Sequence, residues 1–152
     1  MRHQVQGENE CYLATVAALT DQTIVAVRRE ADLICQSFGY TTYTAMRTTS
    51  ANWRRFEEVM ITRYALPRWG TKGGWPLPLP AEHFPKGVDL DLAGRGVIEI
   101  RSSTWGHIVA YEDGFVFDGN CAGPLPYAQW ANMFQKVWPG IKFAIAIKPY
   151  QK

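Results

Sequence analysis

The sequence predicts an α+β fold in which N-terminal helices pack against a C-terminal antiparallel β-sheet. Apolar residues recur at helical spacing between residues 11 and 64, whereas β-branched and aromatic residues alternate beyond Gly94. Between these halves, residues 67–87 contain five prolines and four glycines, which predicts a long loop. No repeat or linker separates the halves, so we expect residues 1–152 to form a single domain.

The composition restricts the class of protein. The chain has 152 residues, 47% of them hydrophobic, and a formal net charge of +2, which predicts one globular core. No apolar run approaches the roughly 20 residues that cross a bilayer, and the N-terminus lacks an apolar signal segment. We therefore expect a soluble, cytoplasmic protein with no membrane partner. Three irregularly spaced cysteines and no basic stripe predict no metal, no cofactor and no nucleic-acid partner.

Three helices are predicted in the N-terminal half. The first begins at Cys11 after a loop of capping residue types and continues through small apolar residues to Thr20. The second covers residues 21–38 and places Cys35 on its buried side, and the third follows Ser50 and ends near Tyr64. Residues 40–44 between them are β-branched and aromatic, which predicts an extended connection.

Strands dominate the prediction for the C-terminal half. An alternating segment over residues 96–102 is followed by two further strands that an Asp-Gly turn joins as a hairpin, residues 107–113 and 115–119. A short helix is expected over residues 127–137 and a closing strand over residues 141–150.

Tryptophans in the loops are candidate substrate-binding side chains. Trp69 and Trp75 lie in the proline-rich loop, and Trp105 precedes the first strand of the hairpin. Long loops often form the rim of a binding site, which indoles suit. The alternative, that Trp69 and Trp75 pin an irregular loop to the core, is equally compatible with the sequence.

Cys11 is the candidate nucleophile. A thiol in the first turn of a helix experiences the partial positive charge of the helix N-terminus, which favours the thiolate. The alternative is a buried structural cysteine, because free cysteine is among the most buried residue types. Catalysis therefore requires partner side chains elsewhere in the chain.

His107 and Asp118 supply such partners. His107 begins the outgoing strand of the predicted hairpin and Asp118 ends the returning strand, with the turn at Asp113 and Gly114. Both residues should therefore lie at the open end of the hairpin, within reach of one hydrogen bond. A carboxylate beside an imidazole fixes the tautomer and stabilises the imidazolium, as acid-base catalysis requires.

These segments resemble the papain-like cysteine peptidases, in particular small bacterial and phage members related to bacteriocin-processing double-glycine peptidases. The resemblance is carried by a Gln shortly before a Cys that opens a small-residue helix, in residues 6–19. It is also carried by Gly-His-Ile-Val-Ala-Tyr at residues 106–111 and by the Asp-Gly-Asn that ends the next strand. The family fold, helices followed by a sheet, agrees with the pattern above.

The resemblance implies roles for individual residues. Cys11 would be the nucleophile, His107 the general base and acid, and Asp118 the orienting third member. An upstream Gln amide would stabilise the oxyanion, and we favour Gln6 over Gln4 because an apolar residue precedes Gln6.

The function predicted from these residues is a thiol hydrolase that cleaves peptide or isopeptide bonds in a protein or peptide substrate. The same three residues would also serve an amidase or acyltransferase acting on a small molecule or cell-wall peptide. A third alternative is a catalytically inactive binding module. Tyr12 occupies a position where relatives often carry Gly, which leaves this alternative open.

Overall fold

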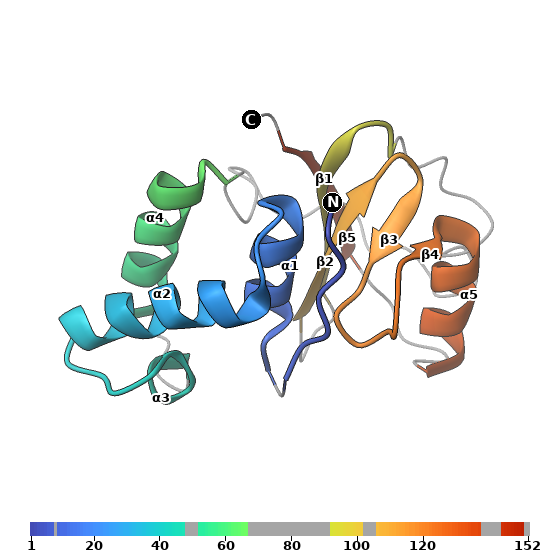
Figure 1. The fold of residues 1–152 in the computed structure, drawn as a ribbon. Helices are drawn as coiled ribbons and strands as arrows, with labels where there is room; N and C mark the ends of the chain where they lie inside the picture. The colour runs from blue at the N-terminus through green and yellow to red at the C-terminus, as the bar shows by residue number, and fades with distance from the viewer. Residues whose placement is uncertain (8, 48–51, 67–91, 102–105, 138–143, 151–152) are drawn as a thin grey trace.

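A computed structural model describes residues 1–7, 9–47, 52–66, 92–101, 106–137 and 144–150. Helices from the N-terminal half cover one face of a five-stranded antiparallel sheet, and one C-terminal helix covers the opposite face (Figure 1). The predicted α+β class is confirmed. No helix in the described part of the chain is long and apolar enough to cross a bilayer.

The N-terminal helices are α1 (Cys11–Leu19), α2 (Ile24–Ser37), α3 (Tyr43–Arg47) and α4 (Trp53–Tyr64). The three long helices match the prediction, and Cys35 is buried as expected. The extended connection predicted over residues 40–44 is wrong, because α3 begins there. The Asp32 carboxylate accepts a hydrogen bond from the Tyr43 N–H at 2.8 Å, and the Thr42 hydroxyl accepts one from the Ala45 N–H at 3.1 Å. These caps outweigh the β propensity of the segment.

The sheet has the strand order β4-β3-β2-β1-β5, and every neighbouring pair is antiparallel. The predicted hairpin is present, with its turn at Asp113 and Gly114, both of which have positive φ. The short edge strand β4 was not predicted. The elements of this half are β1 (Arg95–Arg101), β2 (Gly106–Glu112), β3 (Phe115–Phe117), β4 (Leu125–Pro126), α5 (Tyr127–Val137) and β5 (Ala144–Pro149).

Helices cover both faces of β1, and the burial of the strand reflects this. The alternating sequence of residues 96–102 suggests a strand with one solvated face, but residues 96–100 are all buried. Glu99 is 5% exposed and its carboxylate lies 3.4 Å from the Lys148 ammonium on β5. The ion pair with Lys148 compensates the negative charge of Glu99, which would otherwise be buried without a partner of opposite charge.

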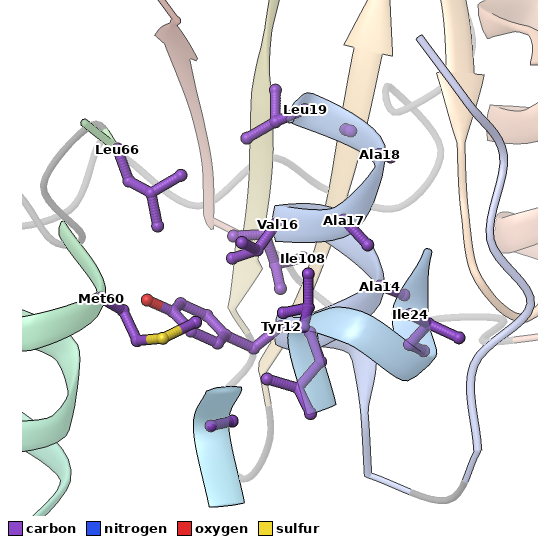
Figure 2. Packing of buried hydrophobic residues seen from close by; sticks show 14 of the residues in the cluster. Tyr12, Ala14, Val16, Ala17, Ala18, Leu19, Ile24, Met60, Leu66 and Ile108 are labelled. Carbon is purple, nitrogen blue, oxygen red and sulfur yellow. The ribbon is translucent and has the colours of Figure 1, made fainter. Parts of the chain in front are cut away.

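The helix that carries Cys11 lies at the centre of the fold. All eight residues from Tyr12 to Leu19 are buried, because α2 and α4 cover one side of α1 and β2 covers the other. Figure 2 shows Tyr12 directed from α1 toward Met60 on α4, with Ile108 of β2 beside it. Burial on nearly every side fixes the axis of α1 and therefore the position of its first residue.

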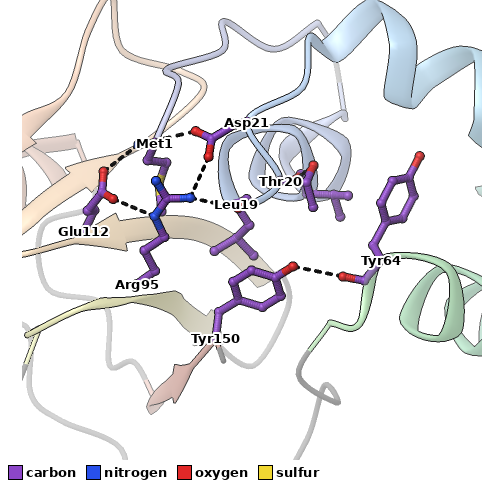
Figure 3. A network of polar contacts seen from close by, with 9 residues as sticks. Met1, Leu19, Thr20, Asp21, Tyr64, Arg95, Glu112 and Tyr150 are labelled. Carbon is purple, nitrogen blue, oxygen red and sulfur yellow. Dashed lines mark hydrogen bonds and ion pairs between the residues drawn. The ribbon is translucent and has the colours of Figure 1, made fainter. Parts of the chain in front are cut away.

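A polar network holds the far end of α1. Arg95 at the start of β1 donates hydrogen bonds to the Leu19 carbonyl at 3.4 Å, to Asp21 at 2.7 Å and to Glu112 at 2.6 Å (Figure 3). Because these contacts join the C-terminal end of α1 to two strands, the helix is anchored to the sheet at the end opposite Cys11.

Candidate active site

Cys11 is the first residue of α1 and is half-buried. The loop before it is fixed through Glu10, whose carboxylate accepts a hydrogen bond from the Gly7 N–H at 3.0 Å. The same carboxylate accepts two hydrogen bonds from the Arg28 guanidinium on α2, at 2.6 and 2.9 Å. A bidentate contact of this kind is geometrically specific, so it holds the loop that delivers Cys11 to the site.

Thr15 sets the position of α1 against β2. Its hydroxyl, 2% exposed, donates a hydrogen bond to the Ile108 carbonyl at 3.1 Å. Thr15 lies one helical turn after Cys11, and Ile108 is the residue after His107. This contact therefore joins α1 to β2 at points one helical turn from Cys11 and one residue from His107.

His107 and Asp118 lie together as the hairpin pattern predicts. The His107 Nε2 atom is 3.1 Å from Asp118 Oδ1, and the two side chains are 11% and 4% exposed. An ionised carboxylate only accepts hydrogen bonds, so Nε2 carries the proton in this contact. Nδ1 is then left for Cys11, which lines the same two cavities as His107 and whose interaction with the imidazole shifts the pKa of both groups.

The Asp118 carboxylate accepts hydrogen bonds on both of its oxygens. Oδ1 also accepts a hydrogen bond from the Asn120 N–H at 3.0 Å, and Oδ2 accepts one from the Trp130 indole N–H at 2.9 Å. Trp130 is fully buried on α5. These contacts fix the plane of the carboxylate. Burial raises the pKa of Asp118, but the hydrogen bond and charge of His107 and the hydrogen bonds from Trp130 and Asn120 outweigh it, so the pKa is lowered.

The electrostatics favour a thiolate-imidazolium pair. Burial opposes charge on both partners, but the contacts with Asp118 and Cys11 outweigh it and raise the pKa of His107 to about 9. For Cys11, burial alone would raise the pKa. The interactions with His107, the charge of Arg47 and the backbone of Ile108 outweigh burial, so the pKa of Cys11 is lowered. The proton is therefore held on the imidazole rather than on the sulfur.

The other two cysteines show the opposite behaviour. Burial, reinforced by the charge of Asp32, raises the pKa of Cys35 to about 11. Burial and the charge of Asp118 raise the pKa of Cys121 to about 11. Cys11 thus differs from both in the direction of its shift, and the cause is its imidazole neighbour.

The structure places the two candidate glutamines differently. The Gln4 side chain accepts a hydrogen bond from the Ile24 N–H at 2.7 Å, so it caps α2. The Gln6 side chain instead lines a cavity with Cys11 and His107. The backbone N–H of Gln6 donates a hydrogen bond to the Gly119 carbonyl at 2.9 Å. Among the described residues, its buried Oε1 atom has no hydrogen-bond partner.

Gly119 makes the placement of Gln6 possible. A Cβ atom at this position would lie 2.7 Å from Gln6 Oε1 and 3.0 Å from the Ala14 Cβ. A side chain on residue 119 would therefore push Gln6 away from the thiol or push the loop away from α1.

Two cavities flank the reactive pair. One, of about 550 Å³, extends toward α5, and the other, of about 440 Å³, extends toward α4. Cys11, His107, Gly106 and Arg47 line both cavities. The Cys11 side chain therefore borders both cavities, which together form a cleft along the site.

The predicted tryptophans Trp69, Trp75 and Trp105 lie outside the described residues. Tyr12 is 4% exposed and packs edge-on against Trp53 with ring centroids 5.2 Å apart. Its ring lies on the α4 side, where it contributes to the smaller cavity and to the core.

Three residues of the site were missed from the sequence. Thr15 could have been found, because a hydroxyl in an otherwise apolar helix needs an acceptor. Trp130 carried a weaker signal, since a buried indole N–H also needs an acceptor. Arg47 gave no signal, because it lies just beyond the extended connection predicted over residues 40–44 and α3 was not predicted.

Comparison of the chain with protein-family models, with curated proteins and with solved structures gives no significant match. Within the described residues, no three His, Cys, Asp or Glu side chains are grouped in a way that could hold a metal ion. The site must therefore be interpreted from its own geometry.

Proposed function

We propose that this chain is a papain-like thiol hydrolase that cleaves peptide or isopeptide bonds, with Cys11, His107 and Asp118 as its catalytic triad. The observation that carries the proposal is the position of the His107 ring. The ring lies 3.1 Å from the Asp118 carboxylate and interacts with the Cys11 thiol, and these residues come from β2, from the position after β3 and from the start of α1. Such an arrangement activates a nucleophile and holds its base in one tautomer.

The proposed reaction has two steps. The Cys11 thiolate attacks the carbonyl carbon, and the resulting tetrahedral oxyanion collapses to a thioester as the amine leaves with the proton of His107. Water then attacks the thioester and gives up a proton to His107. The acid product leaves and the thiolate is restored, so the enzyme returns to its starting protonation state.

Gln6 and the first turn of α1 supply the oxyanion donors in this proposal. Backbone N–H groups in the first turn of a helix have no acceptor within the helix, and that of Cys11 is in this position. The Gln6 amide lines the same cavity as the thiol, whereas the side chain of Gln4 is engaged at α2. Two donors aimed at one oxygen are the usual means of stabilising this intermediate.

An extended substrate is favoured over a small molecule. One cavity extends toward α5 and the other toward α4, and their common lining includes both Cys11 and His107. A peptide chain that crosses the thiol would occupy both cavities, while a small amide would need only one.

Competitive labelling of the three cysteines tests the proposal. We expect iodoacetamide at neutral pH to modify Cys11 much faster than Cys35 or Cys121, because only Cys11 has a lowered pKa among them. Mass spectrometry of the labelled peptides gives each rate. Equal rates, or protection of Cys11 until the protein is denatured, would instead support a binding module without a reactive thiol.

Cleavage of a peptide library measures the activity itself. The wild-type protein should produce new peptide termini at a restricted set of sites, and the Cys11→Ala variant should produce none. Cleavage that persists in Cys11→Ala would assign the activity to a contaminant.

A further inference from the structure

The two cavities beside Cys11 differ in chemistry. The larger is walled on one side by apolar side chains of α5: Met133, Phe134 and Val137. The smaller is lined by three arginines, one from each of three elements: Arg47 from α3, Arg54 from α4 and Arg101 from the end of β1. Separate elements thus bring three guanidinium groups to one side of the thiol.

Among the described residues that line the smaller cavity, three are arginines and one is a carboxylate. Glu99 is that carboxylate, and it lies 3.4 Å from the Lys148 ammonium. Glu99 is 5% exposed, while the Arg54 and Arg101 side chains are both exposed to solvent at the cavity. In the described part of the lining, two guanidinium groups are therefore exposed, and the carboxylate is buried and paired with Lys148.

Arg47 places a third cation next to the thiol. It lines both cavities, and its guanidinium donates a hydrogen bond to the Asn9 carbonyl in the loop before Cys11. Tyr12 and Trp53 supply aromatic surface in the same cavity. A cavity lined by guanidinium groups and aromatic rings matches a side chain with apolar methylenes and a terminal carboxylate.

We propose that the smaller cavity binds an acidic side chain of the substrate, so that the cleft selects peptides with glutamate or aspartate close to the bond attacked by Cys11. This inference rests on the proposed thiol hydrolase function and adds its substrate class. Arg54 and Arg101 are the selecting residues, and Arg47 serves both the substrate and the loop before the nucleophile. The same charges disfavour a lysine or arginine of the substrate at this position.

A matched pair of alkylating probes tests the inference without any turnover. Bromoacetyl-glutamic acid amide and bromoacetyl-glutamine amide have nearly the same shape and the same reactive carbon, and they differ by one negative charge. Both react through the same thiolate, so the ratio of their rate constants at Cys11 cancels any change in the thiolate fraction. The His107 imidazolium also attracts the anionic probe, and variants are therefore needed to isolate the arginines.

The Arg54→Gln/Arg101→Gln double variant should lower the glutamate-to-glutamine rate ratio by about threefold to tenfold at low ionic strength. Arg55→Gln is the matched control, because it removes the same charge from the next position on α4, where Arg55 lies over the Phe38 ring at 4.6 Å instead of in the cavity. Its ratio should equal that of wild type. The two single variants carry the same test if the double variant does not fold.

The wild-type protein provides a second measurement. In a peptide library that places glutamate or glutamine at each position, cleaved peptides should be enriched in glutamate at one position near the cleaved bond. High ionic strength should reduce the enrichment, since it screens exposed charges.

Two failures are distinguishable. If the glutamine probe modifies Cys11 no faster than Cys35 or Cys121, the proposed thiol hydrolase fails, and the substrate class fails with it. If that probe reacts rapidly but the double variant keeps the wild-type ratio, the hydrolase survives and the acidic subsite is refuted.

Discussion

The hydrogen bond between Trp130 and Asp118 predicts a large coupling between two substitutions at the site. The indole N–H donates to Asp118 Oδ2 at 2.9 Å, while Oδ1 serves His107 and the Asn120 N–H. In Asp118→Asn, one side of the carboxylate becomes an NH2 group. If the amide oxygen stays with His107, the NH2 group faces the indole N–H, and two buried donors then oppose each other.

The magnitude follows from the burial of the pair. Trp130 and Asp118 are 0% and 3% exposed, so a donor that loses its acceptor there costs about 1–3 kcal/mol. Trp130→Phe alone loses a hydrogen bond to a charged group, worth about 1.5–3 kcal/mol. In the Asp118→Asn background that bond is already lost, so Trp130→Phe removes the conflict instead. The double variant should therefore be more stable than the sum of the single effects by at least about 1.5–3 kcal/mol.

Urea unfolding of the four proteins in the cycle measures this coupling. Trp53→Phe serves as the control, because Trp53 packs against Tyr12 and Phe56. Its effect should add to that of Asp118→Asn within about 0.5 kcal/mol. Additivity of Trp130→Phe and Asp118→Asn within the same limit would show that the indole does not fix the carboxylate.

Two further predictions concern the placement of Cys11. Thr15→Val removes the hydrogen bond to the Ile108 carbonyl, so it should cost about 1 kcal/mol of unfolding free energy and slow alkylation of Cys11. The control Thr20→Val loses a hydrogen bond to a carbonyl of its own helix and should leave alkylation unchanged. Equal slowing in both variants would contradict the role of Thr15. Gly119→Ala should displace Gln6 and reduce peptide cleavage more than alkylation, because the added Cβ meets Gln6 Oε1 at 2.7 Å, and cleavage at the wild-type rate would exclude Gln6 from the oxyanion site.

The parts of the site that are local in sequence could be predicted. The Asp113–Gly114 turn fixes the register of β2 and β3, so the proximity of His107 and Asp118 followed from the hairpin alone. The start of α1 at Cys11 followed from the change from loop residue types to small apolar residues.

The contacts between distant segments could not be predicted in the same way. Thr15 meets Ile108 across 93 positions of sequence, and hydrophobic periodicity specifies which face of α1 is buried but not which strand it meets. The choice between Gln4 and Gln6 also depended on tertiary structure, since the N-terminus of α2 had to be located before Gln4 could be recognised as its cap. The position of Arg47 in the cleft depends on α3, which caps from Thr42 and from Asp32 on α2 stabilise against the β propensity of its sequence.

The pH profile of Cys11 alkylation tests the central claim most directly. The rise in the pKa of His107 from 6.5 to about 9 favours the imidazolium by roughly 3 kcal/mol at about 1.4 kcal/mol per pH unit. The pKa of Cys11 is lowered from 9.0. The thiolate-imidazolium pair therefore exists at pH values between the lowered pKa of Cys11 and the raised pKa of His107.

Iodoacetamide should therefore react with wild-type Cys11 at a pH below 9.0. His107→Ala should move the profile upward, because burial then acts on the thiol without its main opposing partner. His3→Ala, which changes a histidine bound to the Cys121 carbonyl, should leave the profile in place. If the His107→Ala profile coincides with that of wild type, the two side chains do not act as a pair and the thiol hydrolase proposal is wrong.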